Sequence, residues 1–158
     1  MNLAMIVYLV GTLLEIEAAL LLLPALVGII YGEPSATVFL VTAVVTALLA
    51  AGPVIRKPKN TTIFAREGMV TTTLSWLLMS AIGAIPFFWT GQIPHYLDAL
   101  FEMVSGFTTT GASILTDVER LDKCMLFWRS FSHWVGGMGV LVFMRSEEHT
   151  SELQSLAY

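Results

Sequence analysis

A run of threonine and glycine offers the clearest chemistry in this sequence, and it comprises Thr108, Thr109, Thr110, Gly111 and Ala112. A dehydrated potassium ion needs oxygen atoms in place of its water shell, and the backbone carbonyls of a short extended strand can supply them. Threonine adds a hydroxyl oxygen and a stiff backbone, while glycine can adopt a positive φ that aims successive carbonyls along one axis. We predict that this run lines a cation path, with K+ bound by the carbonyls of Thr109, Thr110 and Gly111.

Charged side chains near this run are weaker candidates. Asp98 and Glu102 are four residues apart, so a helix places them on one face. They could draw cations to an outer mouth or orient the filter by hydrogen bonds, although solvated or structural roles are the stronger interpretation. We expect Arg129 to snorkel or to pair with a carboxylate of the pore loop. His133 is expected to pack rather than to bind a ligand.

The remaining reactive residues form no catalytic or metal-binding set. Cys124 is the single cysteine, and no Cys/His cluster has zinc spacing. Glu15 and Glu17 are two residues apart, so a helix turns them to nearly opposite sides. Each is a candidate for a transport role or for a packing position. No nucleophile–base pair, phosphate-binding loop or nucleic-acid patch is recognisable, so the sequence predicts neither an enzyme nor a nucleic-acid-binding protein, and no cofactor.

The elements that must position these residues are membrane helices. Of 158 residues, 56% are hydrophobic and 13% charged, which excludes an ordinary water-soluble domain. A spanning helix needs about 20 apolar residues. We predict spans at about 3–31, 36–55 and 69–89, with a tight turn from Tyr31 to Pro34, and a fourth apolar segment from Met125 to Met144.

Charge placement predicts the topology and the domain boundaries. Residues 1–55 form a leading transmembrane hairpin, and residues 56–67 form a basic loop with four of the eight Lys and Arg residues. By the positive-inside rule this loop is cytoplasmic, which puts the N-terminus in the cytoplasm as well. Residues 68–144 are then a pore-loop repeat, built from a helix, a re-entrant half-helix, a filter loop and a second helix.

The half-helix and loop are predicted from residues 90–124, which are too polar to span and too apolar for an ordinary connection. The pore helix covers about 95–107 and the filter 108–112. The C-terminal end of the pore helix carries partial negative charge, which favours a cation beside it. Non-helical backbone is tolerated at membrane depth only where it is buried or lines an aqueous path. The alternative is a non-transporting assembly or sensor module in which residues 90–124 form only an external loop.

The last residues, 145–158, are predicted to have a different origin. The segment RSEEHTSELQS, residues 145–155, is the in-frame translation of the common short-read sequencing adapter that begins AGATCGGAAGAGC. We therefore interpret residues 145–158 as an adapter-derived artefact, and a genuine acidic cytoplasmic tail is the alternative. No functional residue is sought there.

Several longer segments carry a family resemblance. The segments ALLLLPALVGIIYGE, REGM, FEMVSGFTTTGAS and FWRSFSHWVGGMGVLV resemble the Trk/Ktr/HKT superfamily of potassium transporters, most closely the Trk-type membrane subunit. The resemblance implies an all-α integral membrane fold of four pore-loop repeats, of which this chain is a fragment with one repeat behind the leading hairpin. It implies that Gly111 is the filter glycine of the first repeat.

The resemblance also implies function and partners. The expected activity is potassium uptake across the cytoplasmic (inner) membrane of a bacterium or archaeon, with K+ as the transported ion rather than a cofactor. The expected partners are membrane lipid, a second copy in a homodimer, and a cytosolic nucleotide-binding regulatory subunit that is TrkA-like. No nucleic acid is expected.

Overall fold

The computed structural model describes residues 2–56, 58 and 65–155, and side chains only for residues 2–56, 58 and 66–139. Every regular element in these residues is helical. The helices are α1 (Leu3–Leu20), α2 (Leu22–Tyr31), α3 (Ser35–Ile55), α4 (Ala65–Trp89), α5 (Tyr96–Phe107), the short 3-10 helix η1 (Val118–Arg120) and α6 (Lys123–Ser155).

Three helical stretches are long and apolar enough to cross a membrane. They are Leu3–Tyr31, Ser35–Ile55 and Arg66–Trp89, and they coincide with the three predicted spans to within a few residues. The first is interrupted at Leu21, between α1 and α2. Pro24 explains the interruption because it has no N–H to donate to the carbonyl of Leu20. Gly32 then closes α2 with a left-handed φ of 69° and begins the predicted turn.

Two boundaries differ from the predicted ones. Helix α4 begins at Ala65, inside the predicted loop of residues 56–67, and residues 57 and 59–64 of that loop lie outside the described residues. Helix α6 continues past Met144 to Ser155, because the segment that follows contains Arg, Glu, Leu and Gln, which are good helix formers. The origin of residues 145–158 stays a prediction.

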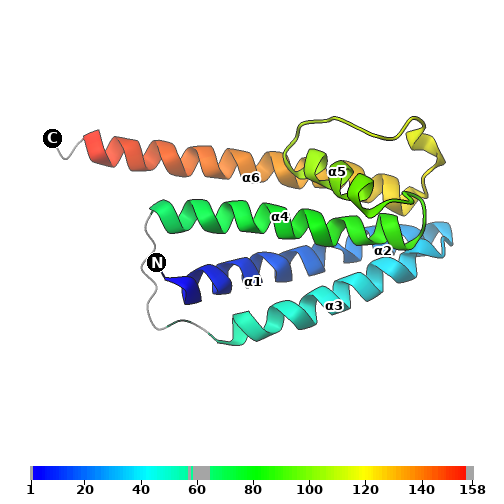
Figure 1. The fold of residues 1–158 in the computed structure, drawn as a ribbon, viewed down its shortest axis with the longest axis horizontal. Helices are drawn as coiled ribbons and strands as arrows, with labels where there is room; N and C mark the ends of the chain where they lie inside the picture. Colours follow the sequence, from blue (N-terminus) through cyan, green and yellow to red (C-terminus); the bar gives the residue numbers. More distant parts are fainter. Residues whose placement is uncertain (1, 57, 59–64, 156–158) are drawn as a thin grey trace.

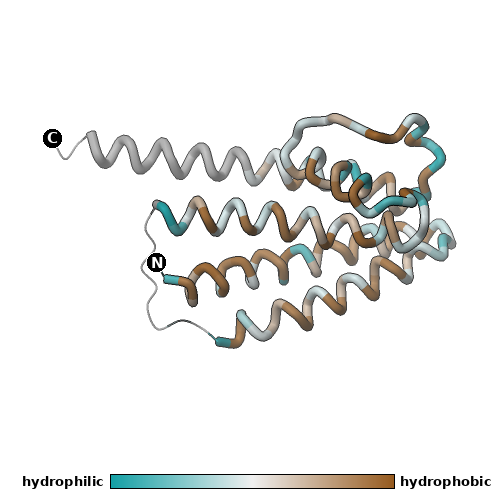
Figure 2. The backbone as a smooth tube through the Cα atoms, viewed as in Figure 1, coloured by the Kyte–Doolittle hydropathy of each residue, from teal (hydrophilic) through white to brown (hydrophobic). Residues whose placement is uncertain are grey.

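The α1–α2 stretch and the helices α3, α4 and α6 lie side by side, and α5 with its following loop sits against one end of them (Figure 1). Helix α1 packs against α3 and α4, while α5 packs between α4 and α6. Apolar residues cover most of α1, α3 and α4, whereas hydrophilic residues gather in the connections at the end that carries α5 (Figure 2). This end corresponds to the predicted outer side.

Trp128 of α6 is the central side chain of this end. It is fully buried, and its ring meets those of Phe39 and Phe107 edge to face, with centroids 6.3 and 6.2 Å away. Its Nε1–H donates to the carbonyl oxygen of Gly83 at 3.1 Å. One indole therefore connects α3, α4, α5 and α6 just beneath the end of α5.

The turn of the leading hairpin caps the start of α6. The carboxylate of Glu33 accepts hydrogen bonds from the backbone N–H of Lys123 at 2.7 Å and of Cys124 at 3.0 Å. Next to Glu33, the Ser35 hydroxyl donates to the Asp122 carboxylate. The backbone N–H of Asp122 donates to the side-chain oxygen of Gln92 at 2.9 Å. These contacts satisfy amides that a helix N-terminus otherwise leaves free.

Glu33→Gln is expected to lower the free energy of unfolding by about 1 kcal/mol, the usual worth of a capping side chain. Partial burial raises the pKa of the Glu33 carboxyl, but the hydrogen bonds from Cys124 and Lys123 outweigh it, so the pKa lies below its ordinary value. A carboxyl with a lowered pKa stabilises the fold above its unfolded pKa, and this contribution is lost as pH falls through the folded pKa.

The measurement is the melting temperature in detergent at neutral pH and at successively lower pH. The gap between wild type and Glu33→Gln should close as pH falls below about 4, near the ordinary pKa of Glu. Glu119→Gln, at an exposed position of η1, should behave as wild type throughout. A gap that persists unchanged at low pH would contradict the capping role.

Candidate functional site

The backbone after α5 folds so that its amides turn back to the helix. The N–H of Thr109 donates to the carbonyl oxygen of Gly106 at 3.0 Å, and the N–H of Thr110 donates to that of Ser105 at 3.0 Å. A longer contact of 3.5 Å joins the N–H of Gly111 to the same Ser105 oxygen. These bonds satisfy the carbonyls at the end of α5.

The same bonds orient the carbonyls of the run. In a planar trans peptide, the C=O of one residue points opposite to the N–H of the next. The carbonyls of Thr108, Thr109 and Thr110 therefore point away from α5. All three residues are exposed, and no donor in the described part of the chain contacts these oxygens. Two of the three predicted carbonyls, those of Thr109 and Thr110, thus face away from α5, and the binding of K+ by the predicted set stays a prediction.

Backbone conformation alternates along the run. Thr109 has a φ of 57° and Gly111 a φ of 75°, with an ordinary negative φ at Thr110 between them. A left-handed φ is open to glycine, but it strains a β-branched residue such as threonine. Strain of this kind costs about 1–3 kcal/mol and gathers at functional sites. The conformation of Thr109 could not be read from its residue type.

Ala112 takes a different position from its neighbours. Its carbonyl oxygen accepts a hydrogen bond of 2.6 Å from the hydroxyl of Ser105, so it is directed back to α5. At the other end of the run, the Thr108 hydroxyl donates to the Val104 carbonyl at 2.7 Å and lies 2.8 Å from the Thr110 hydroxyl. Ser105, which the sequence analysis did not single out, is therefore the residue that fastens the end of the run.

Glu102 fastens the chain just beyond the run. Its carboxylate, fully buried, accepts from the Ser113 hydroxyl at 2.9 and 3.1 Å and from the Ile114 N–H at 3.1 Å. Arg129 of α6 completes the set with an Nε contact of 2.5 Å. The expected pairing of Arg129 with a pore-loop carboxylate is confirmed. Glu102 therefore joins α5, the irregular segment after the run and α6.

Asp98 and Glu102 do not act together. Asp98 is half-exposed one turn earlier, and no side-chain partner of it is found among the described residues. The Glu102 carboxylate binds donors of the protein itself, as a buried carboxylate must, rather than facing solvent. His133 lies on the same side of α6 as Arg129, whose carbonyl oxygen is 2.8 Å from its Nδ1. This contact agrees with a packing role.

Glu102→Gln is expected to destabilise the fold by about 3 kcal/mol, since it leaves the half-buried Arg129 without a carboxylate. Asp98→Asn is the matched control on the same helix and should cost far less. The measurement is the melting temperature in detergent. Equal melting temperatures for the two variants would contradict the fastening role of Glu102.

Glycines let α6 approach the end of α5. A Cβ on Gly136 would lie 2.2 Å from the Phe107 carbonyl oxygen, and a Cβ on Gly106 would lie 2.3 Å from the Ser132 hydroxyl. A Cβ on Gly139 would meet the Trp76 ring at 3.2 Å, whereas one on Gly137 would find nothing nearer than 3.9 Å. Among these glycines of α6, Gly136 lies closest to the backbone of α5.

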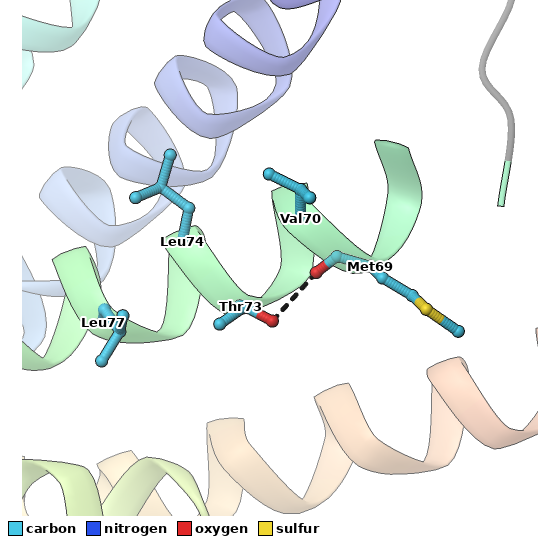
Figure 3. Close-up of a pocket in the computed structure, with 5 residues that line it drawn as sticks. All are labelled: Met69, Val70, Thr73, Leu74 and Leu77. Carbon is cyan, nitrogen blue, oxygen red and sulfur yellow. Dashed lines mark hydrogen bonds between the residues drawn. The ribbon is translucent and has the colours of Figure 1, made fainter. Parts of the chain in front are cut away.

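An apolar groove on α4 lies apart from this site. It has a volume of about 350 Å³ and is lined by Met69, Val70, Thr73, Leu74 and Leu77 (Figure 3). The Thr73 hydroxyl, the one polar side-chain group among these five, donates to the Met69 carbonyl at 3.0 Å. The groove therefore offers a cation little oxygen chemistry, and we do not consider it a candidate for the cation path.

Known proteins share this architecture. A family model described as TrkH, cation transport protein, matches residues 35–146. An uncharacterized cation transporter of Methanocaldococcus jannaschii is 37% identical over 140 residues, which cover 87% of this chain and 29% of that protein. The Trk system potassium uptake protein TrkG of Escherichia coli K12 is 33% identical over 139 residues, with the same coverage of 87% and 29%.

A solved structure agrees with the fold. The crystal structure of the potassium transporter TrkH from Vibrio parahaemolyticus matches with a TM-score of 0.85 and 31% identity, over 92% of this chain and 32% of that one. The chain thus spans about three tenths of the length of the relatives it matches.

Proposed function

The chain belongs to the TrkH family of cation transport proteins, and we propose from this premise that it is part of a potassium-translocating subunit and supplies one of four filter segments. The family is one of transporters rather than of enzymes, as expected from the sequence. Relatives named as potassium uptake proteins favour K+ as the transported ion. In this proposal K+ is a substrate and needs no resident cofactor.

The observation that carries the proposal is the orientation of three successive carbonyls. Thr108, Thr109 and Thr110 are exposed, their following amides are bonded to the end of α5, and their oxygens have no donor in the described residues. Oxygens held in this way can replace part of the water shell of K+. The partial negative charge at the end of α5 adds a favourable field for a cation.

One segment provides only part of a coordination shell. The proposal therefore requires three further segments of similar geometry around the same ion, as the family resemblance implies. Gly111, with its positive φ, follows directly after the three carbonyls that face away from α5. Ala112 marks the outer limit of the segment because Ser105 holds its carbonyl.

The proposal extends to topology and partners. Arg56 and Arg66 flank the connection between α3 and α4, which we assign to the cytoplasm together with the N-terminus, in a cytoplasmic membrane. We further propose that the protein forms a homodimer in the lipid bilayer and binds a cytosolic, nucleotide-binding subunit like TrkA. Copurification with such a subunit from membranes, lost on addition of high salt if the basic loop contributes, tests this part.

Modification of cysteines in the loop tests the filter role. A Thr110→Cys variant should react with a water-soluble thiol reagent, and K+ should slow the reaction several-fold more than Na+ does. Thr116→Cys, at an exposed position farther along the same connection, should react without protection. The native Cys124 is buried and gives little background. Equal rates with and without K+ at position 110 would favour an external loop of a non-transporting module.

A further inference from the structure

One carboxyl group in the first membrane span is buried without a partner. Glu17 lies in the last turn of α1 and is 0% exposed. Neither of its carboxylate oxygens has a hydrogen-bond partner in the described part of the chain. Glu15, two residues earlier, instead lines an open groove with residues of α1, α2 and α3. The two acids therefore have different surroundings, as their spacing predicts.

The helices packed against α1 offer no counter-charge at this depth. Helix α3 has no titratable side chain, and α2 has only Tyr31 at its far end. On α4 the charged residues are Arg66 and Glu67, and Glu67 accepts a hydrogen bond from the backbone N–H of Asn2, at the start of α1. That end is about 20 Å from Glu17 along the helix. Within α1 the other titratable groups are Tyr8 and Glu15.

Burial by its own helices also excludes a partner from elsewhere. Because the side chain of Glu17 is completely covered by the described residues, another segment could reach it only by separating α1 from its neighbours. An isolated carboxylate in such surroundings costs far more free energy than a neutral carboxylic acid. The group is therefore held in its neutral, protonated form.

A helix interruption follows directly after Glu17. Helix α1 ends at Leu20 and α2 begins at Leu22, and Pro24 cannot donate to the Leu20 carbonyl. The break is slight, because Leu21 keeps an αR conformation and its N–H donates to the Glu17 carbonyl oxygen at 2.9 Å, but the bond missing at Pro24 weakens this turn and makes it a hinge. Discontinuous membrane helices recur at the ion sites of transporters. The interruption lies within one turn of the buried carboxyl, so a small bend there would expose it.

We propose that Glu17 is a proton-binding site in the first membrane span, separate from the cation path. The carboxylic acid keeps its proton while α1 is packed against α3 and α4, and exchanges it when the hinge at Leu21 opens to water. The ligand is a proton rather than a metal cation, because a cation needs several oxygens and the nearest other acid, Glu15, lines a separate open groove. The site goes beyond the proposed filter, which lies on α5 and the loop after it.

A lipid-soluble carbodiimide tests the proposal in membranes from cells that express the protein. Dicyclohexylcarbodiimide reacts with protonated carboxyls: the carboxyl oxygen bonds to the central carbon, the proton moves to one nitrogen, and rearrangement leaves a stable N-acylurea. Peptide mapping should find the adduct on Glu17, and Glu17→Gln should abolish it. Glu15→Gln is the matched control and should leave the adduct on Glu17 in place.

The dependence of the labelling on pH and on added cations distinguishes a proton site from a cation site. Labelling of Glu17 should fall about tenfold per pH unit above the midpoint of its ionisation, and saturating K+ or Na+ should not change it. Protection of Glu17 by either cation would overturn the proposal, as would an unlabelled Glu17 in wild-type membranes at every pH tested. Both outcomes are read from the wild-type protein, so they do not depend on the folding of a variant.

Discussion

Replacing Gly111 by serine is expected to lower the selectivity for K+ over Na+ by about tenfold, which corresponds to about 1.4 kcal/mol. Gly111 has a φ of 75°, and no atom lies within 4 Å of the position that a Cβ would occupy. Space is therefore not the difficulty. An L-residue pays about 1–2 kcal/mol in this conformation, so the backbone should relax and shift the neighbouring carbonyls.

Uptake of rubidium or potassium, with sodium as competitor, measures this effect in cells that depend on the protein. Gly91→Ser is a close control because Gly91 has a φ of 72° and is equally unobstructed, but lies in the turn between α4 and α5. It should lower stability to a similar extent and leave selectivity unchanged. If both variants keep wild-type selectivity, Gly111 does not shape the filter.

Gly136→Ala is expected to abolish transport and to lower stability by about 3 kcal/mol, at the upper end of the cost of overpacking. The added methyl group would lie 2.2 Å from the Phe107 carbonyl oxygen and 3.0 Å from the Phe107 Cα. These are backbone atoms, so no side-chain rotation can relieve the contact. The last residue of α5 would have to move, and the carbonyls of the following run would move with it.

The neighbouring glycine makes this prediction specific. Gly137→Ala adds the same methyl group to the same helix, but its nearest neighbour is the Thr109 Cγ2 atom at an ordinary 3.9 Å. This variant should transport normally and gain up to about 1 kcal/mol of stability through helix propensity. The measurements are ion uptake and melting temperature for Gly136→Ala and Gly137→Ala. Equal uptake and equal melting temperatures for the two variants would refute a close contact at Gly136.

Local sequence patterns were sufficient for much of the fold. Helix α5 begins at Tyr96 and ends at Phe107, within one residue of the range expected from apolar spacing. The interruption at Leu21 was not expected, because the apolar run continues through it and Pro24 can be accommodated in many membrane helices. The start of α4 at Ala65 was also missed, since charge marked the loop but not the first helical turn.

Partners distant in sequence were harder to predict. A pairing of Arg129 with a pore-loop carboxylate was expected, yet the sequence did not decide between Asp98 and Glu102. The choice depends on how α5 is rotated against α6, and Glu102 faces the interface while Asp98 does not. The left-handed φ of Thr109 has a similar origin, because the amides of the run must reach the end of α5.

The cap that Glu33 places on α6 has a consequence for the order of membrane assembly. Glu33 precedes the amides it binds by 90 and 91 residues, so the ribosome makes the hairpin long before Lys123 and Cys124 emerge. The hairpin can insert by itself, because it consists of two apolar spans joined by a tight turn. Its turn is then already in place as an acceptor, and the start of α6 can take its register from Glu33 as soon as Lys123 and Cys124 are made.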